Sequence, residues 1–191
     1  DLHGSEHSFP TRRASDLLFD IDPATGAVTF KSAPNYEAPG DAGGNNVYDV
    51  NVTVSDGTNT ATQAVAISVT DTDEAPIFTS GTAASFAENA SGTVYTAAAT
   101  DPDAGSTITY SIAGADAALF DINATTGAIT FKSSPNYEAP GDAGGDNVYD
   151  VIVSATDGVN VTTNAVAITV TNVNEAPTVT SAATANFAEN G

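Results

Sequence analysis

The sequence contains no cysteine, no methionine and no tryptophan, and it has very few basic residues. The lack of cysteine excludes disulfides, zinc–thiolate sites and thiol catalysis. Only four lysines and arginines stand against 24 aspartates and glutamates, which gives a formal net charge of −20 over 191 residues. Nucleic acids and anionic membranes repel such a chain, so we expect no nucleic-acid partner, whereas divalent cations are attracted to it.

Long apolar runs are also missing. No stretch approaches the length of a membrane span, and no signal peptide opens the chain. We therefore expect an internal fragment of an exported protein whose export signals lie elsewhere. Secreted eukaryotic domains of this size often use disulfides, so their absence favours a bacterial protein that is stabilised by other means.

The chain is built from a long internal repeat. Aligning it with itself gives one offset, 101 residues, with about two-thirds of the paired positions identical. The offset relates Phe19 to Phe120, Glu37 to Glu138, and Pro76 to Pro177. A period this long indicates tandem whole domains rather than a solenoid of small units. We predict the back part of one repeat over 18–76, a complete repeat over 77–177 and the start of a third over 178–191.

The first 17 residues do not follow the repeat. They hold both histidines and half of the basic residues, and residues 7–17 (HSFPTRRASDL) resemble a translated frame of a common sequencing-library adapter. We interpret residues 1–17 as an artefact of sequence assembly; the competing interpretation is a short basic arm for docking. His3, His7 and Arg12 therefore carry no weight in the functional argument.

From residue 18 onward, apolar residues alternate with polar ones in short runs that are rich in Val, Ile and Thr. Turn-forming residues separate the runs, and no stretch shows a helical apolar stripe. About seven strands per 100 residues predict an all-β fold made of tandem immunoglobulin-like, antiparallel Greek-key β-sandwiches. The strands expected in the complete repeat lie near 84–87, 93–98, 107–112, 119–122, 128–131, 149–155 and 166–170.

Acidic residues gather where one repeat ends and the next begins. Asp71, Asp73 and Glu74 fall within four residues, directly before Ala75 and Pro76. Carboxylates this close repel one another unless a positive charge lies between them, and the chain offers almost none. The hypothesis is that Ca²⁺ supplies the missing charge and that this segment is a calcium-stiffened joint.

The order of the acidic segments resembles the cadherin repeat family, in particular its bacterial members in large surface adhesins. These segments are Phe86-Ala-Glu88-Asn89, Ala99-Thr-Asp101-Pro-Asp103, Asn136-Tyr-Glu138, Ala155-Thr-Asp157-Gly158 and the linker before Pro76 or Pro177. The resemblance covers nearly everything after residue 17 and implies Ca²⁺ between successive repeats, bound by oxygen ligands alone. The ligands that it implies for the first joint are Glu37, Asp71, Asp73, Glu74, Asp101, Asp103 and Asp157.

The match to the family has departures. The linker before Pro76 is one residue shorter than is usual in the family, and the tripeptide that ends in Glu37 begins with Asn35 rather than with aspartate. The second linker has amides at Asn172 and Asn174 where the first has carboxylates. The second joint should therefore bind Ca²⁺ weakly or not at all in this chain, although Glu88, Glu138 and Glu175 could contribute ligands.

Other functions are less well supported by the residues. Asp101 and Asp103 could act as general acid and base, but nothing predicts an apolar pocket around them, and no nucleophile motif is present, so we expect no enzyme. The acidic, glycine-rich loop 138–147 could wrap a cation, yet a solvated hairpin is the favoured interpretation.

The leading function is a structural one. We expect a calcium-binding repeat in the rigid extracellular stalk of a bacterial cell-surface adhesin, with calcium ions and neighbouring repeats of the same chain as partners. The alternative is a recognition module that binds glycan or another surface protein, with a site in the divergent loops 58–63 and 159–164. A third interpretation is a calcium-indifferent acidic domain of a secreted enzyme.

Overall fold

The computed structural model describes residues 18–184, 186, 187 and 189, and the predictions for residues 1–17 lie outside this part. The described residues divide into two compact units. The first comprises residues 18–74 together with Pro102–Gly105, and the second comprises Ala75–Asp101 and the described residues from Ser106 onward. Within the described residues, no helix is long and apolar enough to cross a membrane.

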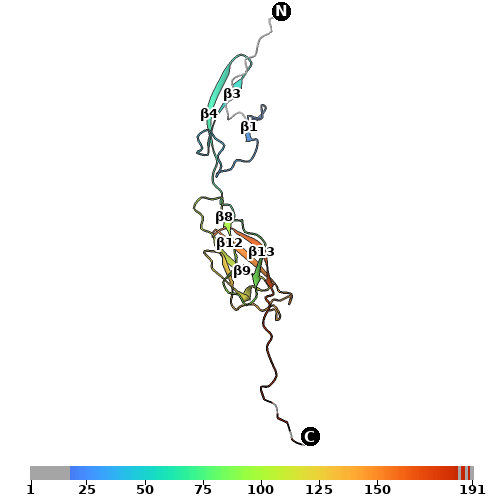
Figure 1. Cartoon of the computed structure of the whole chain (residues 1–191). Helices are drawn as coiled ribbons and strands as arrows, with labels where there is room; N and C mark the ends of the chain where they lie inside the picture. The colour runs from blue at the N-terminus through green and yellow to red at the C-terminus, as the bar shows by residue number, and fades with distance from the viewer. Residues whose placement is uncertain (1–17, 185, 188, 190–191) are drawn as a thin grey trace, which may run out of the picture. The chain divides into compact units, whose positions relative to one another are not determined.

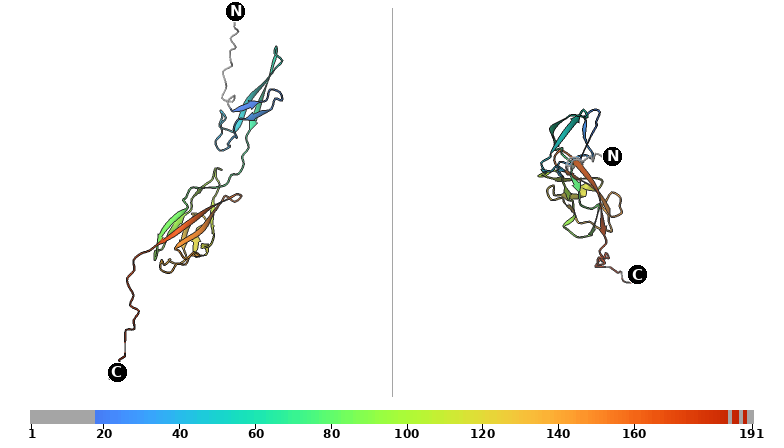
Figure 2. Two further views of the ribbon diagram at one scale, coloured as in Figure 1. Left: turned by 90° about the vertical axis from the view of Figure 1, so that its right-hand side faces the viewer. Right: turned by 90° about the horizontal axis from the view of Figure 1, so that it is seen from above.

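The second unit is a β-sandwich of two sheets (Figures 1 and 2). One sheet has the order β6-β13-β12-β9 and the other the order β10-β11-β7, while β5 and β8 form a separate pair. The strands are β5 (Ile77–Phe78), β6 (Ala83–Ala87), β7 (Thr93–Thr96), β8 (Ala99–Thr100), β9 (Thr109–Ala113), β10 (Phe120–Ile122), β11 (Ala128–Phe131), β12 (Val148–Thr156) and β13 (Val161–Thr171). A short 3₁₀ helix, η2 (Ala117–Leu119), precedes β10. The predicted all-β sandwich is confirmed.

The core of this unit follows from the alternation along its two longest strands. Tyr149, Val151 and Val153 of β12 are buried, whereas Asp150 and Ile152 between them face solvent. The buried residues of β13 are Val166, Ile168 and Val170, and Phe120 and Ile129 come from the opposite sheet. Each buried aliphatic or aromatic side chain contributes about 1.5–3 kcal/mol relative to an exposed one, so these strands hold the two layers together.

One strand pair departs from the antiparallel prediction. β6 runs parallel to β13, with Ala83 opposite Ala167 and Ala87 opposite Thr171. Two antiparallel neighbours can be joined by a tight turn, but β6 and β13 are the first and last strands of their sheet in the sequence and need no direct connection. Because these strands point the same way, the chain enters the sheet at one end and leaves it at the other.

The first unit repeats part of this architecture. β1 (Phe19–Ile21) pairs with β2 (Val28–Phe30), and β3 (Val47–Ser55) pairs with β4 (Thr60–Ser68). Phe19, Phe30 and Tyr48 pack as three rings with centroid separations of 4.4, 5.2 and 5.8 Å, close to the 4.3, 5.0 and 5.9 Å of their repeat partners Phe120, Phe131 and Tyr149. Closely similar local sequence therefore gives closely similar local packing.

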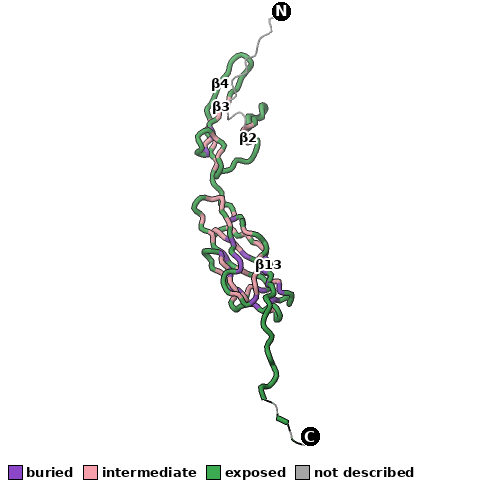
Figure 3. Tube along the Cα trace, viewed as in Figure 1, coloured by how far each residue is buried: buried purple, intermediate pink, exposed green. Residues whose placement is uncertain are grey.

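Burial differs sharply between the two units (Figure 3). Ile168 is fully buried, but its repeat partner Ile67 is only half-buried. Val54 is 67% exposed where its counterpart Ala155 is buried. The first unit has no described strand equivalent to β6, β7 or β9. Among the described strands, both edges of the β3–β4 pair therefore lack a neighbour, and the pair β1–β2 lacks its third strand.

The turn between β10 and β11 gives a test of the fold with a control in the same chain. Gly127 has a φ of +70°, and a Cβ there would collide with the carbonyl oxygen of Ala97. Its repeat partner Gly26 has a φ of +74°, with nothing within 4 Å of its Cβ position.

We expect Gly127→Ala to destabilise the second unit by about 2–4 kcal/mol, because left-handed strain and backbone overlap add. Gly26→Ala should cost the first unit about 1–2 kcal/mol from strain alone. Denaturant unfolding of both variants would measure the difference, and equal costs would contradict the overlap.

Candidate metal centre

Four carboxylates gather at one end of the first unit. Glu37, Asp71, Glu74 and Asp103 each offer an oxygen, and these four oxygens all lie within 4.8 Å of one another. The side chains of Glu37, Asp71 and Glu74 are exposed and that of Asp103 is half-buried. We call this group the first acidic cluster.

Backbone hydrogen bonds place two members of the first acidic cluster. Asn46 Nδ2 donates to the carbonyl of Tyr36 at 2.8 Å, beside Glu37, and the carbonyl of Asn46 accepts the Val69 N–H at 2.9 Å, two residues before Asp71. Asn46 is buried in the left-handed conformation at φ 61°. One residue therefore fixes both the segment that carries Glu37 and the segment that carries Asp71.

The other two members are linked to each other. The backbone N–H of Glu74 donates to Asp103 Oδ2 at 2.8 Å, so the loop Pro102–Gly105 is tied to the segment after β4. Partial desolvation, followed by repulsion from Glu37 and Asp103, raises the pKa of Glu74. A raised carboxyl pKa beside other carboxylates is the sign of unbalanced negative charge.

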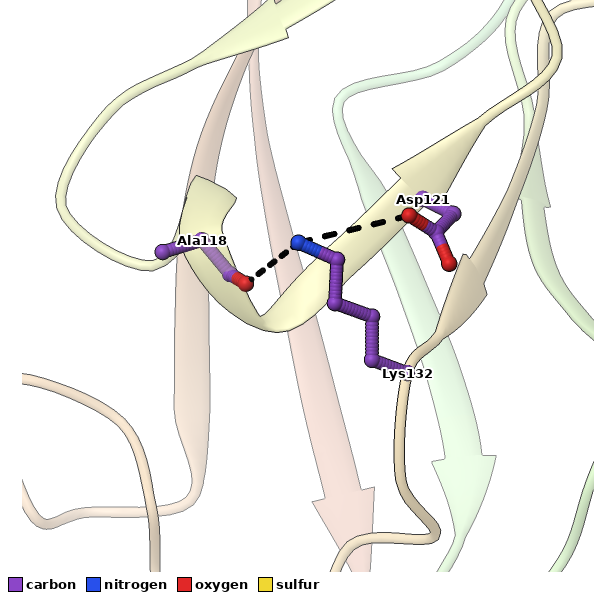
Figure 4. A network of polar contacts seen from close by, with 3 residues as sticks. All are labelled: Ala118, Asp121 and Lys132. Carbon is purple, nitrogen blue, oxygen red and sulfur yellow. Dashed lines mark hydrogen bonds and ion pairs between the residues drawn. The ribbon is translucent and has the colours of Figure 1, made fainter.

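The positive charges of the described residues lie elsewhere. Lys31 Nζ is 3.5 Å from Asp20, and Lys132 Nζ lies 4.0 Å from Asp121 and donates to the carbonyl of Ala118 at 2.8 Å (Figure 4). Lys132 thus connects η2 to the β10–β11 hairpin. Neither lysine neutralises the first acidic cluster.

The remaining three predicted ligands are not part of the group of four. Asp73 is exposed and lies between Asp71 and Glu74 in the sequence, while Asp101 and Asp157 belong to the second unit, where both are half-buried. The Oδ1 atom of Asp157 accepts the N–H groups of Val159 and Asn160 at 2.6 and 2.7 Å, and the first of these bonds is the main cause that lowers the pKa of Asp157.

Asp157 also carries an atom that the protein leaves unsatisfied. Its Oδ2 is buried and has no hydrogen-bond partner in the part of the chain that the structure describes. Buried polar atoms in folded proteins nearly always have a partner, so this oxygen suits a ligand from outside the chain. The donors at both places are carboxylate oxygens, which fits Ca²⁺ and not a metal that prefers nitrogen or sulfur.

A second acidic cluster lies within the second unit. It consists of Glu88, Glu138 and Glu175, whose oxygens also lie within 4.8 Å of one another. Glu88 is only 2% exposed, and backbone N–H groups of Val173 and Tyr137 lower its pKa by donating to it. Glu138 and Glu175 match Glu37 and Glu74 at the repeat offset, which is the signal that points to this cluster from the sequence. No local pattern in the sequence indicates that Glu88 is buried.

The acidic loop 138–147 joins β11 of one sheet to β12 of the other and is tied by its own hydrogen bonds, so it is not the predicted hairpin. Asp142 is buried and accepts the N–H groups of Asp146 and Asn147 at 3.0 and 3.1 Å. Asp116 is buried beneath the loop and accepts the Ala143 N–H at 2.7 Å. Because backbone donors satisfy these carboxylates, the geometry favours the interpretation in which this loop wraps no cation.

Comparison with known families identifies the fold. Residues 82–174 match the family model of the cadherin domain, and this segment lies inside the repeat predicted over 77–177. A comparison with curated proteins finds no match.

Solved cadherin structures resemble the chain over most of its length. The EC1-2 fragment of human protocadherin-24 aligns with a TM-score of 0.56 at 25% identity, over 82% of this chain and 77% of that one. The EC22-24 fragment of mouse cadherin-23 gives 0.53 at 25% identity, over 82% and 50%. Drosophila N-cadherin EC1-4 gives 0.57 at 22% identity, over 80% and 39%, a likeness of fold. The fold is a cadherin-like β-sandwich, an architecture of structural and adhesion proteins.

Proposed function

We propose that this chain is a calcium-binding structural segment of the extracellular stalk of a bacterial surface adhesin. The observation that carries the proposal is the first acidic cluster, in which four carboxylates from three segments converge without a basic neighbour among the described residues. A cadherin-like fold and a repeat of 101 residues support a spacer rather than a single recognition site.

The residues have separate roles in this mechanism. Glu37 would hold the ion from the loop after β2, Asp71 and Glu74 from the segment after β4, and Asp103 from the loop that Glu74 binds. Asp73, Asp101 and Asp157 are proposed as further ligands, the last through its buried Oδ2. When bound, Ca²⁺ supplies the positive charge that cancels the repulsion among these groups.

Neutralisation would limit the motion of the joint. Glu74 and Asp103 flank the points at which the chain passes from one unit to the other. While the carboxylates repel one another, the Glu74–Asp103 hydrogen bond has to hold these points together against that repulsion, and once the repulsion is cancelled they are held more firmly. In a compartment poor in calcium the repeats would swing about their linkers, and they would stiffen after export.

The test is thermal unfolding and small-angle scattering of the full chain in millimolar Ca²⁺ and in chelator. We expect calcium at 100 times the dissociation constant to raise the free energy of unfolding by about 2.7 kcal/mol, and the melting temperature with it. We also expect calcium to extend the particle. The double variant Asp71→Asn with Asp103→Asn should lose most of both effects.

The matched control is Asp49→Asn with Asp150→Asn, which removes the same charge from exposed positions on β3 and β12. This variant should respond to calcium as the native chain does. A native chain that shows no response at millimolar calcium would overturn the stalk proposal and favour a recognition module, which a glycan array with single repeats would then examine.

A further inference from the structure

We infer that the second acidic cluster is held together by the chain's own carboxamides and backbone N–H groups, so that the linker Asn172–Glu175 stays attached to the second unit whether or not calcium is present. The inference is independent of calcium binding at the first acidic cluster. It concerns two linkers that occupy the same place in the repeat and differ in their side-chain chemistry.

Glu88 is the centre of this arrangement. Its Oε2 accepts the Tyr137 N–H and its Oε1 accepts the Val173 N–H, both at 2.8 Å. Its backbone N–H in turn donates to the carbonyl of Thr171 at 3.0 Å. The buried carboxylate thus connects the start of the linker to the loop that carries Glu138, using donors that carry no charge.

The two other carboxylates each accept a side-chain amide. Asn172 Nδ2 donates to Glu138 Oε1 at 2.7 Å, and Asn89 Nδ2 donates to Glu175 Oε1 at 2.7 Å. Asn172 and Glu175 lie in the linker, whereas Glu138 and Asn89 lie in the body of the unit, so the two bonds cross between linker and body in opposite directions. Hydrogen bonds to carboxylates are stronger than those between neutral groups, which suits a permanent attachment.

The first linker differs at the positions that matter. Asn172 corresponds to Asp71 and Asn174 to Asp73 at the repeat offset. Asp71 adds a carboxylate to the first acidic cluster, where Asn172 gives a donor to the second. A change of one side-chain nitrogen for an oxygen therefore turns an internal hydrogen bond into a further repulsion, and with it creates the need for a cation.

The first experiment is amide hydrogen exchange by NMR on the full chain, read at the Val173 N–H in calcium and in chelator. Because this N–H is bound to Glu88, its protection should be the same within a factor of about two in both conditions. Asn172→Ala removes the bond to Glu138 without adding charge, and should speed the exchange of Val173 at least tenfold. Protection that collapses in chelator for the native chain would overturn the inference.

The second experiment exchanges aspartate and asparagine between the two linkers and measures the amount of bound calcium by equilibrium dialysis. In a chain that carries Asp71→Asn and Asp73→Asn, no site of millimolar or better affinity should remain if the second cluster holds itself. Adding Asn172→Asp and Asn174→Asp should tighten calcium binding at least tenfold and make the protection of Val173 depend on calcium. Melting of the second unit would confirm that each variant folds.

The outcomes separate this inference from the proposed function. If the native chain binds no calcium while Val173 stays protected in chelator, the stalk proposal fails and the amide attachment stands. If the Asp71→Asn, Asp73→Asn chain still binds calcium, and Glu138→Gln removes that binding, the second cluster is a cation site and the inference is wrong. If adding Asn172→Asp and Asn174→Asp does not tighten calcium binding, the role given to the two amides is also wrong.

Discussion

Ile168→Ala should lower the free energy of unfolding of the second unit by about 3–5 kcal/mol, the upper part of the range for truncating a buried aliphatic side chain. Ile168 is fully buried at the middle of β13, opposite Tyr149 on β12 and Ala84 on β6. Truncation leaves a cavity that strands on both sides cannot fill, because each is fixed in register. Denaturant unfolding, followed by tyrosine fluorescence, measures the loss.

The repeat provides the control for this substitution. Ile67 occupies the same place on β4, but it is only half-buried and β4 pairs with β3 alone among the described strands. Ile67→Ala should therefore cost the first unit about 1 kcal/mol, since less apolar surface is lost and solvent fills the space. Equal costs at the two positions would mean that the first unit is covered as completely as the second.

Asp116→Ala is expected to destabilise the second unit by about 3–5 kcal/mol. Asp116 is 3% exposed, and its two carboxylate oxygens accept the N–H groups of Ala143 and Asp150, both at 2.7 Å. Alanine leaves the two part-buried N–H groups of Ala143 and Asp150 without their acceptor, and each such loss costs about 1–3 kcal/mol. The acidic loop 138–147 should also lose its attachment, which exchange at the Ala143 N–H would report.

Asparagine at the same position separates the two bonds. Asp116→Asn keeps one acceptor oxygen and replaces the other by an NH₂ group, which cannot accept a hydrogen bond. Depending on how the amide is oriented, either the Ala143 N–H or the Asp150 N–H stays bound, so one of the two hydrogen bonds survives. We expect a loss intermediate between the native chain and the alanine variant. An asparagine variant as unstable as alanine would show that the charge matters more than the number of acceptors.

The sandwich could be predicted because its signal is local. The alternation along residues 149–155 reflects a strand's two-residue period, and the 101-residue offset is found by aligning the sequence with itself. The parallel pairing of β6 with β13 could not, since it joins segments about 84 residues apart and depends on how the whole sheet closes. The short helix η2 is held by a hydrogen bond from Lys132, which no local pattern predicts.

Four of the seven predicted ligands lie close together in the structure. Glu37, Asp71, Glu74 and Asp103 do come together, because the Asn46 brace and the Glu74–Asp103 bond draw their segments to one place. Asp73 illustrates the limit, since spacing along a loop does not fix the direction in which a side chain points. The roles of all seven residues as calcium ligands remain predictions. The hydrogen bonds from the side-chain amides in the second acidic cluster were not predicted, because an asparagine in a linker indicates by itself only a weaker calcium ligand.

The parallel pair β6–β13 has a mechanical consequence. In the proposed stalk the chain would be pulled from its two ends, and it enters this sheet through β6 and leaves through β13. Since the two neighbours point the same way, tension draws β6 backward and β13 forward along their common axis. The hydrogen bonds from Ala83–Ala167 to Ala87–Thr171 then bear the load together, in shear, and do not open one after another as in a hairpin pulled from its open end. Force applied along the chain thus meets the sheet in its most resistant direction.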